Sequence, residues 1–238
     1  MKTVSIGDTH GMAVVDSVMK IIDNFDKFIF VGDYVDSFDV DDHSMKTNLL
    51  DLIELKSKYP EKVVLLWGNH DIHYLLGKDY YCSGYRPGMR KVFHTIFQEN
   101  EKLFQFSYQS GDYIWTHAGI TEFWFEKKFR TGNIELTIAD LLNEAFTLRY
   151  PPLFDIGYNR EGRQRTGGPL WCDKAELISG PLKGYNQIVG HNRVEEVEIL
   201  WTGDKKIILI DVLENNEEVD GGCFFYLVLN NKKLATKP

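Results

Sequence analysis

Short polar clusters flanked by glycine follow a series of strand-like runs, and this pattern constrains the fold more than any other feature of the chain. Apolar runs over Lys2–Ile6, Lys27–Val31 and Val63–Trp67 are each followed at once by a glycine. Between these runs, apolar residues recur at helical spacing over Met12–Ile22 and His43–Lys58. The alternation of strand and helix predicts a parallel sheet with crossover helices.

The rest of the sequence mixes helical and strand-like patterns. A turn at Ser110-Gly111-Asp112 predicts a hairpin between Gln105–Gln109 and Tyr113–His117. Glu122–Arg149 is mostly helical in pattern, with a break near Gly132-Asn133. Later strands are expected over Gln187–Val189, Val194–Trp201, Lys206–Leu213 and Cys223–Leu229. We predict an α/β fold (an α+β sandwich), with mixed β-sheets packed centrally and flanked by helices, as a single domain over residues 1–238.

Composition argues against several classes of protein. Lys and Arg number 27 and Asp and Glu 35, so the net charge is −8, which disfavours non-specific binding of nucleic acid. No apolar run is long enough to span a bilayer, and no signal-peptide pattern comes first, so a cytoplasmic protein without a membrane partner is expected. The three cysteines form no zinc-binding or disulfide pattern. The sequence gives no oligomeric state.

The polar clusters have the composition of a metal site. They read GDTHG at 7–11, GDYVDS at 32–37, GNHD at 68–71, THAG at 116–119 and GHN at 190–192. Ligands of open α/β sheets bind beyond the carboxyl ends of the strands, so these clusters should converge. Oxygen and imidazole ligands without thiolates suit manganese, iron(II) or zinc. Asp33 follows the middle of three strands, which places its carboxylate to bridge two ions for an in-line displacement.

Each cluster taken alone has an ordinary structural explanation. A Gly-Asp pair is usually a turn, and Asn69-His70-Asp71 could cap a helix. Several such clusters in order at strand ends are hard to explain in that way. His43, His73 and His94 lie outside the pattern and are interpreted as ordinary surface or core residues.

The order of these motifs resembles the calcineurin-like metallophosphoesterase superfamily. Its pattern of D-x-H, G-D-x-x-D, G-N-H-[D/E] and two histidine motifs is matched in order between residues 8 and 191. GDYVD, GNHD and the PLWCD at 169–173 look most like the phosphoprotein-phosphatase branch. That branch contains bacterial and phage protein phosphatases and dinucleoside tetraphosphatases.

The resemblance implies a role for each matching residue. The implied metal ligands are Asp8, His10, Asp33, Asn69, His117 and His191. They would hold two divalent ions, with Mn²⁺ expected first and Fe²⁺/Fe³⁺ or Zn²⁺ as alternatives. A hydroxide that bridges the ions would attack phosphorus, and His70 would act as the general acid. Asp36 would hydrogen-bond to His70 and fix its ring.

One position departs from the family pattern. The family usually continues G-D-x-x-D-R-G, and its arginine grips the phosphate, whereas this sequence has Ser37 and Phe38. Another arginine is expected to supply the bidentate contact. The candidates near the motifs are Arg86, Arg90, Arg163, Arg165 and Arg193.

These features predict a metal-dependent phosphomonoesterase, with phosphorylated Ser, Thr or Tyr of a protein, or a small phosphoester, as its substrate. The alternative enzyme is a nucleotide or dinucleoside polyphosphate hydrolase, for which Tyr80, Tyr81 and Tyr85 could stack a base. A third interpretation, which the Ser37-Phe38 departure allows, is a catalytically silent binding module with the same fold.

Overall fold

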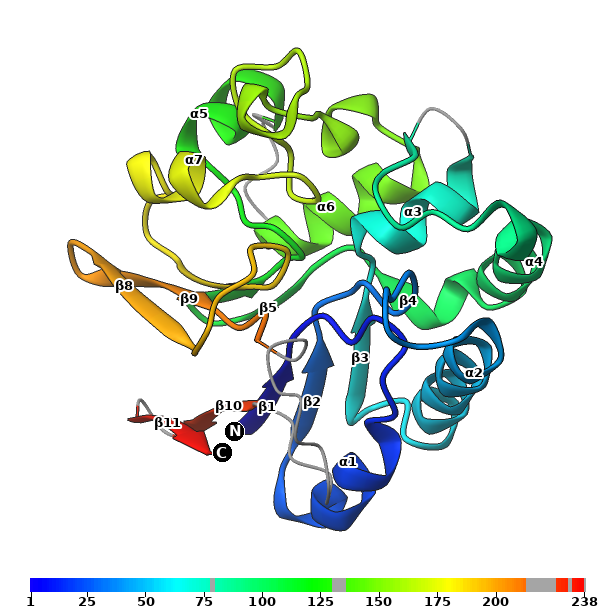
Figure 1. The fold of residues 1–238 in the computed structure, drawn as a ribbon. Coiled ribbons are helices and arrows are strands. Elements are labelled where there is room, and N and C mark those ends of the chain that lie inside the picture. Colours follow the sequence, from blue (N-terminus) through cyan, green and yellow to red (C-terminus); the bar gives the residue numbers. More distant parts are fainter. Residues whose placement is uncertain (78–79, 130–135, 213–225, 231–232, 238) are drawn as a thin grey trace.

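The chain forms two β-sheets with helices outside them (Figure 1). The computed structural model describes residues 1–77, 80–129, 136–212, 226–230 and 233–237. Its first sheet has the order β11-β10-β1-β2-β3-β4, and its second has the order β5-β6-β7-β9-β8. The strands are β1 (Lys2–Ile6), β2 (Lys27–Phe30), β3 (Val63–Leu66), β4 (Phe104–Gln105), β5 (Tyr108–Ser110), β6 (Tyr113–Trp115), β7 (Asn186–Val189), β8 (Glu198–Thr202), β9 (Lys205–Leu209), β10 (Tyr226–Asn230) and β11 (Lys233–Lys237). The α-helices are α1 (Val15–Ile21), α2 (Asp42–Lys58), α3 (Asn69–Leu76), α4 (Arg90–Glu99), α5 (Glu122–Trp124), α6 (Ile138–Thr147) and α7 (Lys174–Ser179).

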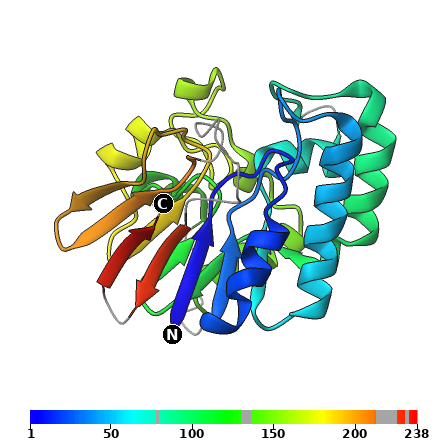
Figure 2. The same cartoon turned by 60° about the horizontal axis from the view of Figure 1, so that its bottom comes forward.

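The predicted strand–helix alternation in the first third of the chain is confirmed. Strands β1, β2 and β3 are parallel neighbours, with Val4 opposite Phe28 and Ile29 opposite Val64. Helices α1 and α2 connect them and lie on one side of the first sheet (Figure 2). This arrangement brings the carboxyl ends of the three strands together at one edge.

Alternating side chains of the strands build the core on both faces of the first sheet. In β2, Phe28 and Phe30 pack with the helices, whereas Ile29 and the following Val31 pack against the second sheet. The outer face of the second sheet packs against α7 through Leu177. The layers therefore run from helices through two sheets to further helices, as the sequence predicted.

The predicted strand over Gln105–Gln109 is wrong as a single element. Gln105 belongs to β4 in the first sheet, whereas Tyr108 begins β5 in the second. The chain crosses between the sheets at Phe106 and Ser107, whose amides both donate to Asn143 Oδ1, at 2.7 and 3.1 Å. The Asn143 side chain from α6 holds this crossing in place, and the local sequence pattern could not reveal so distant a contact. The predicted hairpin itself is confirmed, since β5 and β6 pair antiparallel.

Several predicted boundaries differ from the structure. The first helix begins at Val15 rather than Met12. The segment after Glu122 divides into α5, a π-helical turn over Phe125–Phe129, and α6; the break expected near 132–133 lies outside the described residues. Strand β8 begins at Glu198 rather than Val194, and residues 223–225 of the last predicted strand are likewise outside the described part. Strand β11 was not predicted. The single-domain organisation stays a prediction.

Within the described ranges, no helix is both long enough and apolar enough to cross a bilayer.

Candidate active site

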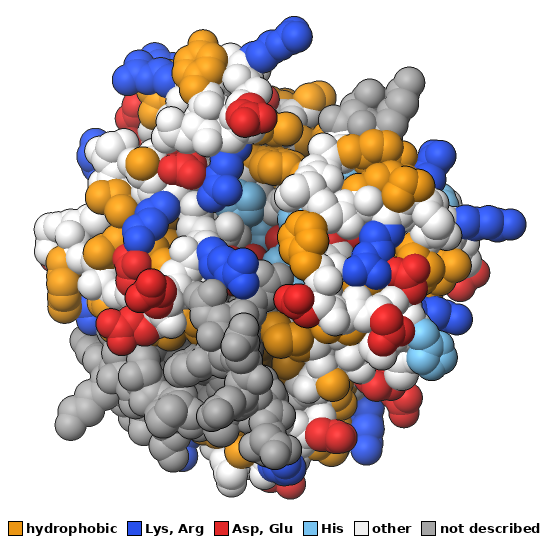
Figure 3. Space-filling view, in the orientation of Figure 1, with side chains coloured by type: hydrophobic (Ala, Val, Ile, Leu, Met, Phe, Trp, Pro, Cys, Tyr) orange, Lys and Arg blue, Asp and Glu red, His pale blue; other side chains and the backbone are white. Residues whose placement is uncertain are grey.

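The predicted site residues follow strand ends in both sheets and meet in one hollow. Asp8 follows β1, Asp33 follows β2, and Asn69 begins α3 directly after β3. From the second sheet, His117 follows β6 and His191 follows β7, which is parallel to β6. Figure 3 shows histidine side chains at the bottom of a hollow with Lys and Arg side chains around it. Segments more than a hundred residues apart therefore contribute to the same site.

The first group of potential metal ligands is Asp8, His10 and Asp33, whose ligand atoms lie within 4.8 Å of one another. His10 Nε2 lies 4.0 Å from Asp33 Oδ2, and His10 Nδ1 bonds to the carbonyl of Val35 at 3.0 Å. A carbonyl partner at Nδ1 fixes the ring and leaves the Nε2 lone pair for a cation.

The second group is Asp33, His117 and His191, again within 4.8 Å. His117 Nε2 lies 3.4 Å from Asp33 Oδ2 and 2.8 Å from Asn69 Oδ1, which is also 2.9 Å from His191 Nδ1. His117 Nδ1 bonds to the carbonyl of Val31 at 2.8 Å. Because Asp33 belongs to both groups, its carboxylate lies where one residue can bridge two ions.

Unpartnered atoms show that this donor set fits cations. Asp8 Oδ1 and His191 Nε2 are buried and have no hydrogen-bond partner among the described residues. Buried polar atoms are rarely left without a partner, so each such atom needs an explanation. Divalent ions at the two groups would satisfy both atoms, and oxygen with imidazole is the ligand set that such ions prefer.

Several carboxylates lie close together in this hollow, and their pKa values are shifted in different directions. Burial, followed by the charges of Asp211 and Asp33, raises the pKa of Asp8 well above its usual value. Burial and the charge of Asp33 raise the pKa of Asp71 to about 8. Burial acts the same way on Asp33, but His117 and His70 outweigh it and hold the pKa of Asp33 well below the usual range. Among these three carboxylates, Asp33 is the one whose ionised form is favoured.

Backbone strain is concentrated in the same residues. Four of the predicted site residues adopt a positive φ, namely His10 (41°), Asp33 (54°), Asp36 (66°) and His191 (60°). Such conformations cost of order 1–3 kcal/mol each and persist only where surrounding contacts hold them. The contacts that hold the Asp33 turn come from Asp71.

Asp71 is the fixed point of this turn. Its Oδ2 accepts the N–H groups of Asp33 and Gly68, both at 2.9 Å, and its Oδ1 accepts the N–H of Tyr34 at 2.9 Å. The side chain is fully buried. The sequence placed Asp71 in a cluster without giving it a role, because two of its three partners, Asp33 and Tyr34, lie in a loop 38 and 37 residues away.

Two of the glycines allow carboxylates to lie directly against the backbone. A Cβ at Gly68 would meet Asp33 Oδ1 at 2.1 Å, and one at Gly190 would meet Asp8 Oδ1 at 1.9 Å. The close approach lets backbone N–H groups near each glycine bind the carboxylate. The N–H of His70 donates to Asp33 at 2.9 Å, and the N–H of His191 donates to Asp8 at 2.8 Å. Glycine at these two positions is therefore a steric requirement of the site.

The expected contact between His70 and Asp36 is present. His70 Nδ1 lies 3.1 Å from Asp36 Oδ2, and the hydroxyl of Tyr74 donates to Asp36 Oδ1 at 2.5 Å. Burial lowers the pKa of His70, but Asp33 and Asp36 outweigh it, so the pKa lies well above its ordinary value. These neighbours favour the protonated form of His70.

His73 corrects an expectation from the sequence. It was assigned no part in the site, yet its Nε2 lies 2.6 Å from Asp36 Oδ2 and its ring is fully buried. His70, His73 and Tyr74 stand at positions i, i+3 and i+4 of α3, which puts them on one face around Asp36. That spacing was the signal that could have identified His73. His43 is exposed, and His94 bonds to the carbonyl of Tyr74 at 2.9 Å, so neither joins the site.

The five predicted arginines lie in different surroundings. Arg86 is held by Asp42 and by the carbonyls of Ser37 and Val40, which makes it a support for the turn that lacks the family arginine. The guanidinium of Arg165 lies 4.4 Å from the centre of the Phe123 ring. Arg90, Arg163 and Arg193 are exposed.

Arg160 was not predicted, and it bonds to Asn192, the residue that follows the predicted ligand His191. It donates from Nη2 to Asn192 Oδ1 at 2.6 Å, and its Nε lies 3.1 Å from Asp173 Oδ2. Its charge is among the influences that lower the pKa of His191, after burial and His117. No local motif marks Arg160, since its partners come from the PLWCD and GHN segments.

Comparison with known proteins agrees with this geometry. The profile of the family described as calcineurin-like phosphoesterase matches residues 1–226. The chain belongs to this family. It is accordingly a metal-dependent phosphoesterase, as the sequence motifs predicted. Comparison with curated proteins found no match.

Solved structures show the same fold. A cold-active protein-tyrosine phosphatase of a psychrophilic Shewanella species superposes with a TM-score of 0.64 at 19% identity, over 99% of this chain and 77% of that chain. Another structure titled cold-active protein tyrosine phosphatase, at 1.1 Å, gives a TM-score of 0.61 at 20% identity, over 99% and 75% of the two chains. These similarities establish the fold.

Replacing Asp71 with alanine should destabilise the protein strongly. Asp71→Ala would leave three buried N–H groups without an acceptor, at about 1–3 kcal/mol each, so we expect urea unfolding of the metal-free protein to show a loss of about 3 kcal/mol or more. Asp51→Ala, on the exposed face of α2, is the control and should change stability by less than about 0.5 kcal/mol. Equal stability of the two variants would remove Asp71 from its supporting role.

Proposed function

We propose that this chain is a phosphomonoesterase that acts on phosphorylated Ser, Thr or Tyr side chains of proteins and uses two divalent ions that share Asp33. The observation that carries the proposal is the presence of Asp33 in both ligand groups, with the His70–Asp36 pair beside them. A scaffold without catalytic activity has no physical need for this combination.

The residues divide the work between holding ions and moving a proton. Asp8, His10, Asn69, His117 and His191 would complete the two ligand sets around Asp33. When bound, the ions supply an activated water and positive charge for the phosphoryl oxygens. Manganese suits the oxygen-rich set best, with iron or zinc as alternatives.

His70 is proposed as the general acid. Its backbone N–H is bound by Asp33, and its ring is oriented by Asp36, so the ring is fixed beside the ligand groups. The raised pKa favours the protonated ring, which could donate to a departing alkoxide. Asp36 acts through His70 and is a positioning residue.

Protein phosphoesters are favoured over dinucleotides by the packing of the tyrosines. The Tyr85 ring stacks on Tyr81 at 4.0 Å between centroids and also contacts Tyr74 at 5.3 Å, and Tyr80 packs against Phe154. These contacts engage Tyr80 and Tyr85 in packing within the protein, so stacking of a base on them would compete with that packing. The matching fold of a protein titled as a tyrosine phosphatase is the reason to include phosphotyrosine.

Arg160 is proposed as the phosphate contact in place of the arginine missing at Ser37. Its guanidinium is already oriented by Asp173 and Asn192, next to His191, and it remains partly exposed. Arginine held in this way is suited to a bidentate bond with phosphate oxygens. We propose no nucleic-acid or membrane partner, and a cytoplasmic location stays a prediction.

A substrate panel tests the proposed function. With Mn²⁺ added, the protein should hydrolyse p-nitrophenyl phosphate and phosphopeptides, and diadenosine tetraphosphate should be turned over at least about 10-fold more slowly, which corresponds to about 1.4 kcal/mol. Preference for diadenosine tetraphosphate would favour the nucleotide alternative. Bound manganese without hydrolysis of any ester would favour the silent binding module.

Asp33→Asn should abolish activity by removing the shared ligand. An amide offers one oxygen in place of two and carries no charge, so we expect turnover to fall by about 100-fold or more and fewer than two manganese ions to be retained after dialysis. Metal analysis by mass spectrometry reads the second effect directly. Asp39→Asn, at an exposed position of the following loop, should match the unmodified protein in both measurements.

His70→Asn should separate chemistry from metal binding. We expect both ions to be retained, while kcat for phosphopeptides, whose leaving groups are poor, falls by about 10²–10⁴-fold. The loss for p-nitrophenyl phosphate should be smaller, because p-nitrophenolate leaves without protonation. The exposed His43→Asn is the control. Equal losses for both leaving groups would contradict the general-acid role.

Arg160→Lys should weaken the grip on phosphate. Loss of a bidentate charge-assisted bond predicts about a 10-fold higher KM and a similarly weaker inhibition by inorganic phosphate. Arg163→Lys, at an exposed neighbouring position, should leave both unchanged. If instead Arg193→Lys alone weakens phosphate inhibition, the clamp is Arg193.

A further inference from the structure

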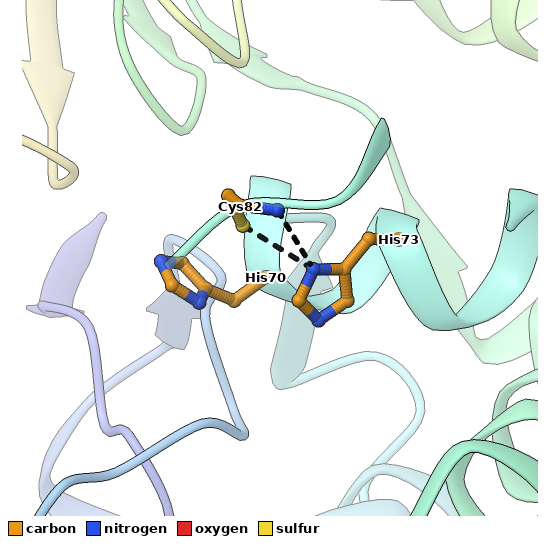
Figure 4. A group of neighbouring side chains, drawn as sticks. All are labelled: His70, His73 and Cys82. Carbon is orange, nitrogen blue, oxygen red and sulfur yellow. Dashed lines mark hydrogen bonds between the residues drawn. The ribbon is translucent and has the colours of Figure 1, made fainter. Parts of the chain in front are cut away.

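A second group of metal-ligating side chains lies beside the first two and differs from them in chemistry. His70 and His73 project from one face of α3, and Cys82 comes from the loop that follows this helix (Figure 4). One ligand atom from each of the three residues lies within 4.8 Å of the others. The predicted metal ligands include no thiol and none of these three residues, so this group is a different set of ligands.

The spacing of the group is close to that of a zinc site. Cys82 Sγ lies 3.3 Å from His73 Nδ1, and the Cys82 N–H is 3.5 Å from the same nitrogen. Zn–S and Zn–N bonds of about 2.3 and 2.0–2.1 Å in a tetrahedron separate sulfur from nitrogen by about 3.5 Å. A shift of a few tenths of an ångström would therefore let both atoms bind one ion.

The surroundings of the group also match those of bound zinc. Asp36 Oδ2 lies 3.1 Å from His70 Nδ1 and 2.6 Å from His73 Nε2, so one carboxylate supports both rings from behind. A carboxylate against the second nitrogen of a histidine ligand fixes the ring and increases its basicity. A thiolate with two imidazoles favours zinc over manganese, which prefers oxygen.

We propose that His70, His73 and Cys82 form an inhibitory zinc site, distinct from the two-ion centre at Asp33. An imidazole nitrogen that ligates zinc has no proton to donate. Zinc in this site would therefore withdraw His70 from the reaction through ligands that the Asp33 centre does not use. Zinc binding is independent of the proposed function, whereas inhibition rests on the proposed role of His70.

Two measurements on the full chain test the site. Cobalt(II) added to the manganese-loaded protein should give sulfur-to-cobalt charge-transfer absorption, since thiolate ligation produces it and the Asp33 centre offers no thiolate. The band should be absent from Cys82→Ser and retained in Cys223→Ser, which removes a different thiol.

The second measurement is zinc inhibition of the manganese-loaded enzyme, with p-nitrophenyl phosphate and phosphopeptides as substrates. The activity of each protein is expressed relative to its own rate without zinc. The half-inhibitory concentration of Zn²⁺ should be at least about 10-fold higher for Cys82→Ser than for the unmodified protein. Cys82→Ala repeats both measurements with a different side chain.

The outcomes separate this proposal from the proposed function. Absence of the band in the unmodified protein, or its persistence in both Cys82 variants, would overturn the zinc site. Equal zinc inhibition with and without Cys82 would show that zinc acts at the Asp33 centre instead. A thiolate band without inhibition would overturn the inhibitory effect and would count against His70 as general acid, while the zinc site itself would stand.

Discussion

The turn at Asp33 is the constraint on which the rest of the site depends. Its backbone adopts a left-handed conformation with φ of 54°, and the buried carboxylate of Asp71 holds it there through the N–H groups of Asp33 and Tyr34. The Asp33 side chain then faces ligands from both sheets. One oxygen receives the N–H of His70 and the other faces His10 and His117. Without this turn, the two ligand groups would share no carboxylate.

The charge balance explains why such a hollow belongs to a cation-binding protein. Asp8 and Asp71 are buried near Asp33, and burial with mutual repulsion raises the pKa of both. Repulsion of this kind destabilises a fold unless positive charge is placed among the carboxylates. Protonated His70 supplies part of that charge, and divalent ions would supply more. Binding of metal and stability of the fold are therefore linked in this chain.

The sequence predicted most of the features that depend on short segments. The strand–helix alternation of the first third, the central sheets with flanking helices, and the approach of Asp8, Asn69 and His191 to Asp33 all follow from local patterns and from the rule for strand ends. The features that it missed depend on contacts between distant segments. The crossing at Phe106 and Ser107 is fixed by Asn143 in α6, and Arg160 is placed by Asp173 and Asn192. Cys82 joins His73 only through the path of the loop after α3.

The thiol-containing group of His70, His73 and Cys82 lies beside the set around Asp33, because the backbone N–H of His70 donates to Asp33. The proposed chemistry rests on the set around Asp33. The most direct measurement is anomalous diffraction from crystals soaked with manganese. We predict two anomalous peaks on either side of the Asp33 carboxylate, about 3.5–4 Å apart. One should contact Asp8 and His10, and the other Asn69, His117 and His191. A single peak, or two peaks that do not share Asp33, would contradict the two-ion account.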